Sequence, residues 1–290
     1  MHHRKPNKQE LKKRSVHILF CLIFICLLCF PQTARTGAYA GMTLWANTVI
    51  PVLFPFLLAS GLFASLGMAS GKWYAVLLGF LCGYPMGAKA ACDLVKEGSV
   101  TKKQGQWLMC CCNLPSPMFL TGFIRIPAVT WAVYVPAVML LIPVFFFPEH
   151  KKRKLSSESH SEDLPGIMPL LEQAMDSSVK IMIKIGIYMM VFSILSVWIQ
   201  TFHFLSPFMR TLLPGLSEMT IGINAAKNAG FSMRQQAVLC AIFCTFGGCS
   251  GLSQTKSVTE DAAFSMKFYI LIRLLHVAAA VIIICCWHFE

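Results

Sequence analysis

Long apolar segments are the feature that most constrains how this sequence can fold. Five of them approach or exceed the roughly 18 to 20 apolar residues that cross about 30 Å of hydrocarbon, and they cover residues 16–30, 42–66, 127–147, 181–199 and 268–287. Hydrophobic residues make up 56% of the chain and charged residues only 13%, which is more apolar than a soluble domain of this length. The sequence therefore predicts an all-α, polytopic transmembrane protein.

The first apolar segment has two interpretations. Basic residues precede it and small residues such as Ala34 and Ala40 follow it, which is also the pattern of a cleaved signal peptide. Because another apolar segment follows almost at once, we favour an uncleaved first span.

Positive charge is concentrated at the ends of the apolar segments. The formal net charge is +12, with basic residues from Arg4 to Arg14 before the first segment and Lys151–Lys154 after the third. Cytoplasmic loops of membrane proteins carry an excess of Lys and Arg. We therefore expect the N-terminus and a polar linker at 148–165 to be cytoplasmic, with an even number of crossings between them. This distribution makes the lipid bilayer the expected partner and argues against nucleic acid.

The reactive side chains form no recognisable catalytic or metal-binding pattern. The 13 cysteines lie mostly singly or as neighbours within apolar sequence, where cysteine behaves as a small apolar residue. The sequence has no His-Glu-x-x-His motif and no Ser/His/Asp grouping. We expect no metal, no cofactor and no enzymatic activity.

Glycine and proline interrupt two of the apolar regions, at 82–89 and at 246–251. Backbone that is left unpaired at membrane depth costs several kcal/mol per group unless it is buried in protein or lines a polar cavity, so such interruptions often mark a permeation site. In the first region Gly83, Tyr84, Pro85 and Gly87 favour a tight turn whose amides face a solute. These interruptions indicate a transporter.

Lys89 follows this turn and lies between alanines. An ammonium group within apolar sequence would suit an anionic solute. The alternative is that its long side chain reaches the membrane interface and has no role in binding.

A third interruption lies in the span that begins near Gln106. Pro115 and Pro117 remove helical hydrogen bonds and free carbonyl groups, while Asn113 and Ser116 add polar side chains at the same level. This combination predicts part of a binding site, and a proline kink that only packs helices is the alternative.

The second half contains a comparable set of polar residues. Glu218 is the only carboxylate between Asp176 and Glu260, and it would either carry a proton or cation, or simply cap a helix. These two roles stay open. The other candidates of this half are Thr220, Gly222, Gly247, Gly248, Ser250 and Gln254.

The two halves of the chain resemble each other weakly, over about 40–147 and 166–287. Each half is expected to contain a span, a re-entrant hairpin and a broken helix, and the residues at 167–180 an amphipathic interfacial helix. With four membrane crossings in the first half, the two hairpins would enter the membrane from opposite sides. This predicts two inverted repeats within one transporter domain over 1–290, as expected for alternating access.

Five motifs, taken in order, resemble a known family. They are Asn47-Thr-Val-Ile-Pro51, Gly83-Tyr-Pro-Met-Gly-Ala-Lys89, Asn113-Leu-Pro-Ser-Pro117, Glu218-Met-Thr-Ile-Gly222 and Phe246-Gly-Gly-Cys-Ser250. The chain resembles the YlbJ family, also called stage V sporulation protein V, of integral membrane proteins from endospore-forming bacteria.

The resemblance implies a nucleoside-recognition, or Gate, domain that is similar to the core of concentrative nucleoside transporters. It also implies transport of dipicolinic acid across the outer forespore membrane. By the same resemblance, residues 83–89 and 113–117 would form one half of the site, and residues 218–222 and 247–254 the other half.

The leading hypothesis is therefore a transporter for a small organic anion, with dipicolinate as the first candidate solute. A coupling proton or sodium ion and homo-oligomerisation are left open. A nucleoside-type transporter would use uncharged contacts and make Lys89 dispensable. A non-transporting scaffold for spore-envelope assembly would depend more on the linker at 148–165. An intramembrane enzyme ranks last, because the sequence shows no catalytic nucleophile together with a general base.

Overall fold

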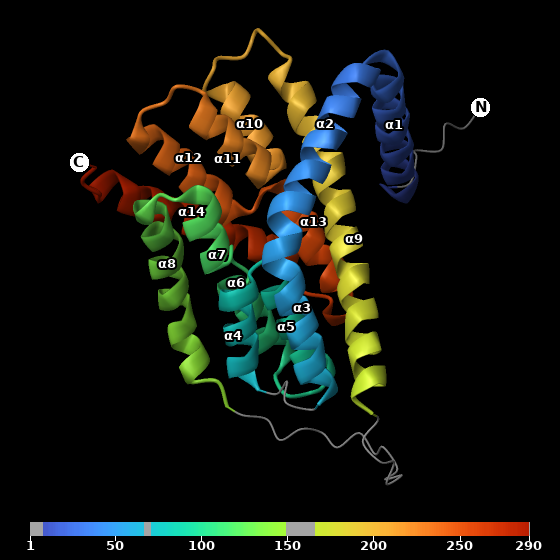
Figure 1. The fold of residues 1–290 in the computed structure, drawn as a ribbon, viewed down its shortest axis with the longest axis vertical. Helices are drawn as coiled ribbons and strands as arrows, with labels where there is room; N and C mark the ends of the chain where they lie inside the picture. Colours follow the sequence, from blue (N-terminus) through green and yellow to red (C-terminus); the bar gives the residue numbers. More distant parts are fainter. Residues whose placement is uncertain (1–7, 67–70, 149–165, 290) are drawn as a thin grey trace.

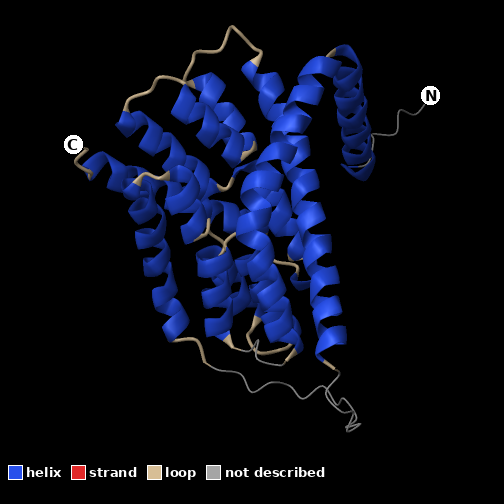
Figure 2. Ribbon diagram, viewed as in Figure 1, coloured by secondary structure: helices blue, strands red, loops and turns tan. Residues whose placement is uncertain are grey.

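The computed structural model describes residues 8–66, 71–148 and 166–289, and every element in these ranges is a helix (Figure 2). The expected all-α fold is confirmed, and no strand occurs in the described ranges. Most of the expected linker at 148–165 lies outside the described residues, as do residues 1–7.

The first half contains eight α-helices and two short π-helical stretches (Figure 1). Proline begins three of these helices, at a position where its missing N–H leaves no hydrogen bond unmade. The elements are α1 (Lys8–Cys29), α2 (Pro31–Leu44), η1 (Trp45–Val49), α3 (Ile50–Ser65), α4 (Lys72–Cys82), α5 (Met86–Lys96), α6 (Lys102–Cys112), α7 (Pro117–Phe119), η2 (Leu120–Ile124) and α8 (Pro127–Phe145).

The second half contains six α-helices and one 3-10 turn. Side-chain caps begin three of them, because the carboxylate of Glu218 and the hydroxyls of Ser232 and Ser265 accept bonds from backbone N–H groups of the first turn. The elements are α9 (Ile167–Gln200), α10 (Met209–Ser217), α11 (Met219–Asn228), α12 (Met233–Phe246), α13 (Gly248–Val258), η3 (Glu260–Ala262) and α14 (Met266–Cys286).

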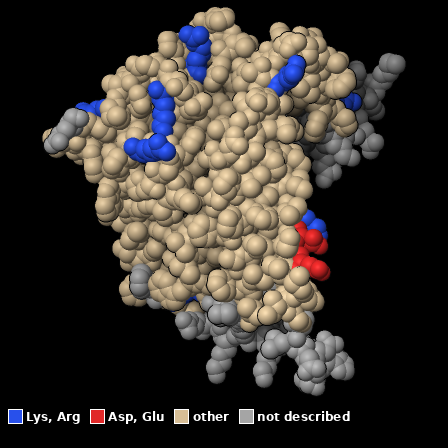
Figure 3. Space-filling view, viewed as in Figure 1, with Lys and Arg blue, Asp and Glu red and all other residues tan. Residues whose placement is uncertain are grey.

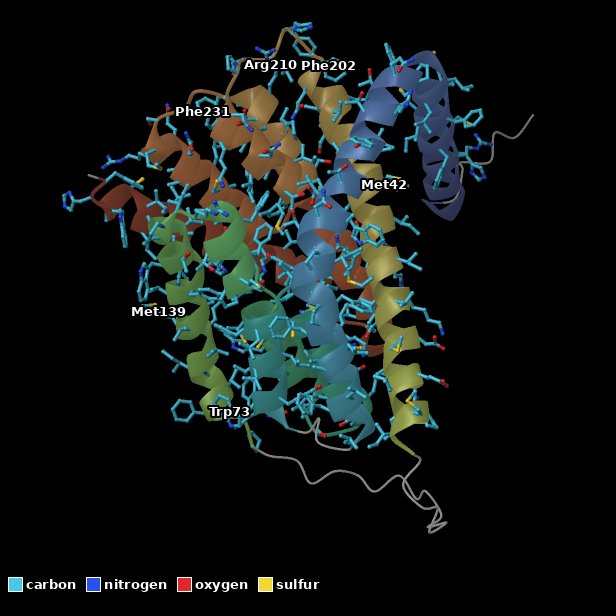
Figure 4. All side chains as sticks on the ribbon, in the orientation of Figure 1. Met42, Trp73, Met139, Phe202, Arg210 and Phe231 are labelled. Atoms are coloured by element: carbon cyan, nitrogen blue, oxygen red, sulfur yellow. The ribbon has the colours of Figure 1, made fainter. Side chains whose placement is uncertain are left out.

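Six helical segments are long and apolar enough to cross a membrane: 31–63, 102–124, 127–144, 167–200, 233–258 and 266–286. Large apolar side chains lie on the outside, as Met42 and Met139 do at 52% and 63% exposure (Figure 4). The face seen in Figure 3 has no charged side chain over a broad central area. An outer surface of this kind suits a lipid environment rather than water.

Small residues let α2 pack closely along α9. A Cβ atom added at Gly37 would lie 2.6 Å from the backbone of Ile194, and one at Gly41 would lie 2.8 Å from the Ser193 hydroxyl. Glycines four residues apart are a common means of close helix packing in membranes. The indole of Trp45 donates to the carbonyl of Met182 on α9 at 3.0 Å. These contacts hold the first and second halves of the chain together.

One expectation differs in detail from the structure. The residues at 167–180 do not form a separate interfacial helix, because α9 runs without interruption from Ile167 to Gln200. The sequence in this stretch contains no glycine or proline between Pro169 and Gly186 that would end the helix.

Candidate functional site

The first hairpin consists of α4 and α5, with its turn at Gly83–Pro85. Gly83 adopts φ +77° and ψ −154°, a region that is essentially restricted to glycine. A Cβ atom there would lie 2.6 Å from the amide nitrogen of Ser116. Gly87, in the first turn of α5, approaches α6 equally closely, because its Cβ atom would lie 2.2 Å from the carbonyl oxygen of Cys112. Glycine therefore lets the hairpin turn touch the end of α6.

The first break is the non-helical stretch 113–116 between α6 and α7. Ser116 caps α7, since its hydroxyl accepts from the Phe119 N–H, and Pro117 occupies the first helical position. The carbonyl of Pro115 accepts a bond of 2.9 Å from the Tyr134 hydroxyl on α8. The predicted interruption is present, and the freed carbonyl of Pro115 is bonded within the protein.

The second hairpin consists of α10 and α11, and Glu218 forms its turn. The Glu218 carboxylate is 3% exposed and accepts bonds from the Ile221 N–H at 2.9 Å and from the Thr220 hydroxyl. Gly222 lies against α10, where its added Cβ atom would be 2.1 Å from the Cα atom of Gly215. Glu218 is thus a helix cap, and Gly222 permits the two arms to pack.

The second break lies at Gly247, between α12 and α13. Gly247 has φ +83° in the left-handed region, and Gly248, at φ +66°, packs near the carbonyl of Ser217 in the second hairpin. Because the helix ends here, the carbonyl of Cys244 is free to accept a 3.0 Å bond from the Tyr84 hydroxyl. Tyr84 therefore ties the turn of the first hairpin to the second break.

The two hairpin turns and the first break meet around one small cavity, of about 70 Å³. Five predicted residues line it, namely Tyr84, Ser116, Glu218, Thr220 and Gln254. Gln254 also donates to the Ser250 hydroxyl at 3.0 Å on the same face of α13. We call this space the central cavity. Sites for small molecules typically measure about 300 to 1,000 Å³, so it must widen to admit an organic solute.

Part of the lining of the central cavity comes from elements that were not predicted to belong to the site. Thr48 and Val49 belong to the π-helical stretch η1, and Ile185 and Met189 belong to α9. Stretches of π-helix are frequent at functional sites, but their hydrogen-bond register cannot be read from a sequence.

Lys89 does not line the central cavity. Its ammonium group pairs with Asp93 at 2.5 Å, one turn further along α5, and both side chains are more than one third exposed. They line a second cavity of about 370 Å³ between α3, α4, α5 and α9, which we call the side cavity. Near its mouth, Lys96 pairs with Asp261 at 2.7 Å, and this ammonium holds the pKa of Asp261 below its ordinary value.

A third space of about 10 Å³ lies between these two cavities. It shares Ile181 with the side cavity, and it shares Ile185 and Gln254 with the central cavity. Pro85 of the first hairpin also lines it. The three cavities therefore form a row along the inner face of α9.

Asn113 is fully buried but serves a different set of contacts from the one expected. Its amide donates to the Thr255 hydroxyl and to the Tyr269 hydroxyl, both at 2.8 Å. It thus links the first break to α13 and α14.

The sequence analysis missed two buried polar residues on α14, Arg273 and His276, which are 0% and 2% exposed. Their spacing of three residues inside an apolar span would have been a signal, because polar residues on one helix face at membrane depth usually point inward. Within the described ranges, no three His, Cys, Asp or Glu side chains gather to hold a metal ion.

With this geometry in place, the comparison with known proteins is informative. The chain is similar to the sporulation integral membrane protein YlbJ of Bacillus subtilis strain 168. The two are 22% identical in an alignment that covers 97% of this chain and 84% of that protein. No family model and no solved structure matches. The similarity supports the YlbJ family, and together with the six apolar helices it supports an integral membrane protein.

We expect Tyr84→Phe to lower the free energy of unfolding by about 1 to 3 kcal/mol, because the buried carbonyl of Cys244 would lose its partner. Thermal unfolding of the purified protein in detergent would measure this. Tyr188→Phe is the control, since Tyr188 lines only the smallest space. An equal loss in both variants would show that the bond to Cys244 contributes nothing specific.

Proposed function

We propose that this chain is a membrane transporter for a small organic anion, and that the anion is dipicolinate during sporulation. The observation that carries the proposal is the meeting of two hairpin turns and a helix break around the central cavity. Broken helices whose free backbone groups surround a polar space are typical of solute sites at the middle of transporters. The similarity to a sporulation membrane protein supports the sporulation context.

In this proposal the two hairpins are re-entrant and belong to inverted repeats, as in the Gate-domain fold. Supporting this, α4 begins at the lower end of the molecule, near Trp73, whereas α10 begins at the upper end, near Arg210 (Figure 4). Figure 1 shows the hairpins opening toward these opposite ends. The lower end would be cytoplasmic, as expected for the basic linker, and the protein would lie in the outer forespore membrane.

The proposal gives each of these residues a role. Ser116, Thr220 and Gln254 would orient the solute in the central cavity. Glu218 would take up a proton when the solute binds. The solute would enter through the side cavity, on its way along α9. Movement of the hairpins relative to α3 and α9 would open the central cavity to each side in turn.

A nucleoside-type solute is the second candidate. The observation that favours it is the chemistry of the central cavity. Among the residues that line this cavity, Glu218 is the only Asp, Glu, Lys, Arg or His. Hydroxyl and amide groups suit the uncharged hydrogen-bonding edges of a nucleoside. This candidate predicts that Lys89→Gln has no effect on flux.

The test is the uptake of labelled dipicolinate into proteoliposomes that hold the purified protein, beside a labelled nucleoside and empty liposomes. Saturable dipicolinate uptake under an imposed proton or sodium gradient would support the proposal. Nucleoside uptake alone would favour the second candidate. Flux of neither solute under any gradient would favour a non-transporting scaffold in the spore envelope.

A further inference from the structure

Arg273 of α14 is the most deeply buried charged residue in the described part of the chain. It is 0% exposed, and one guanidinium nitrogen, Nη2, donates to the Cys110 carbonyl at 2.7 Å. The guanidinium carbon lies 4.9 Å from the ring centre of Tyr269. Its other two nitrogens, Nε and Nη1, have no hydrogen-bond partner among the described atoms. No described carboxylate forms an ion pair with it.

This burial is difficult to explain by packing alone. A guanidinium taken out of water costs several kcal/mol, and an ion pair or a full set of hydrogen bonds normally offsets that cost. One carbonyl bond and one aromatic ring do so only in part. Ionisable residues at membrane depth are usually retained for function.

The guanidinium lies within electrostatic range of one residue of the central cavity. Tyr84, which lines this cavity, is close enough to Arg273 for the charge to act on its hydroxyl group. Tyr269, beside the guanidinium, holds Asn113 of the first break at 2.8 Å. The Asn113 side-chain oxygen also lacks a partner in the described structure. A positive charge at this place raises the electrostatic potential in the central cavity, because the surrounding protein screens the charge weakly.

Lys89 is poorly suited to the same task. It is paired with Asp93, so the two charges cancel locally, and water reaches both. An exposed, paired charge has little net effect on a distant site.

We infer that Arg273, rather than Lys89, supplies the positive charge that selects an anionic solute, and that the solute carries a carboxylate. The inference rests on the proposed transport function. Arg273 acts across Tyr84 in this conformation, so it is a specificity-determining residue and not a direct contact. A carboxylate suits this charge, because its negative charge is attracted by a guanidinium that weakly polar protein separates from the solute.

The experiment compares a dianion with an uncharged solute of the same shape. Binding and uptake of dipicolinate and of pyridine-2,6-dicarboxamide are measured for the unaltered protein, Arg273→Met, Arg273→Lys and the control Lys89→Gln. We expect Arg273→Met to lose the preference for the dianion at least tenfold, and Arg273→Lys and Lys89→Gln to keep it. We also expect the solute-free melting temperature of Arg273→Met not to fall, because an apolar side chain removes an uncompensated buried charge.

The other outcomes distinguish an error in the inference about Arg273 from an error in the proposed transport function. If the unaltered protein takes up dipicolinate and Arg273→Met keeps its preference for the dianion, the inference is wrong and the proposed function stands. If Arg273→Met weakens both solutes equally and lowers the melting temperature, Arg273 is structural. If the unaltered protein takes up neither solute, the proposed function fails first. Should Arg273→Met not fold, Arg273→Gln is measured in the same assay, and an unchanged preference there overturns the inference.

Discussion

Substitution Glu218→Gln is expected to abolish the dependence of solute flux on an imposed proton gradient while the protein stays folded. The side-chain oxygen of glutamine can still accept the bond from the Ile221 N–H, so the cap of α11 survives. The amide cannot take up or release a proton, and a buried carboxylate at the turn of a hairpin is well placed to do so. Flux into proteoliposomes with and without a pH gradient measures the effect.

Glu218→Ala is the matched control for the capping role. It removes both functions and should cost about 1 kcal/mol of stability through the lost cap. If Glu218→Gln transports with full proton dependence and only Glu218→Ala is impaired, Glu218 is a helix cap and nothing more. The pair of variants therefore decides between the two roles that the sequence left open.

Substitution Gly83→Ala is expected to destabilise the protein strongly, through backbone strain and overpacking together. Alanine would have to adopt φ +77° and ψ −154°, which costs about 1 to 3 kcal/mol. Its Cβ atom would also lie 2.6 Å from the Ser116 nitrogen, and such overpacking against backbone adds about 1 to 3 kcal/mol. The sum of about 2 to 6 kcal/mol is a large fraction of the roughly 5 to 15 kcal/mol by which folded proteins are stable, so we expect a smaller yield of monodisperse protein on size-exclusion chromatography.

Two other glycines separate these contributions. Gly71 has a similar φ of +83°, but a Cβ atom there would meet nothing within 4 Å, so Gly71→Ala reports the backbone cost alone. Gly251 lies in α13 with the same free space and a helical backbone, so Gly251→Ala should be neutral or slightly stabilising. Equal stability of Gly83→Ala and Gly71→Ala would show that the contact with the first break is loose.

The sequence predicted the interruptions well because glycine and proline restrict the backbone locally. The breaks at 113–116 and Gly247 and the turn at Gly83–Pro85 are present where glycine and proline interrupt the sequence. Such features depend on few neighbours, so they can be read from a short stretch of sequence. The turn at Glu218 was not predicted, because the sequence indicated there only a helix cap or a proton carrier. The re-entrant nature of the hairpins and their inverted relation stay predictions.

The positions of single side chains were harder to predict, because they depend on helix register. Lys89 is close in sequence to the turn, yet the helix that starts at Met86 rotates it toward Asp93 and the side cavity. The spacing of four residues between these opposite charges was a usable signal. For Arg273 the usable signal was its spacing of three residues from His276 inside an apolar span, and the packing of α14 against α6 shows that its side chain points inward.

The uninterrupted course of α9 affects where a solute would enter. At 1.5 Å per residue, its 34 residues extend for about 51 Å, whereas the hydrocarbon layer is about 30 Å thick. Even a tilted α9 extends past the lipid tails, and its first turns carry Glu172, Asp176 and Lys180. Gln173 and Ser177 from these turns line the side cavity. In a membrane this entrance would therefore lie at the level of the lipid headgroups, where a hydrated ion can enter without first crossing hydrocarbon.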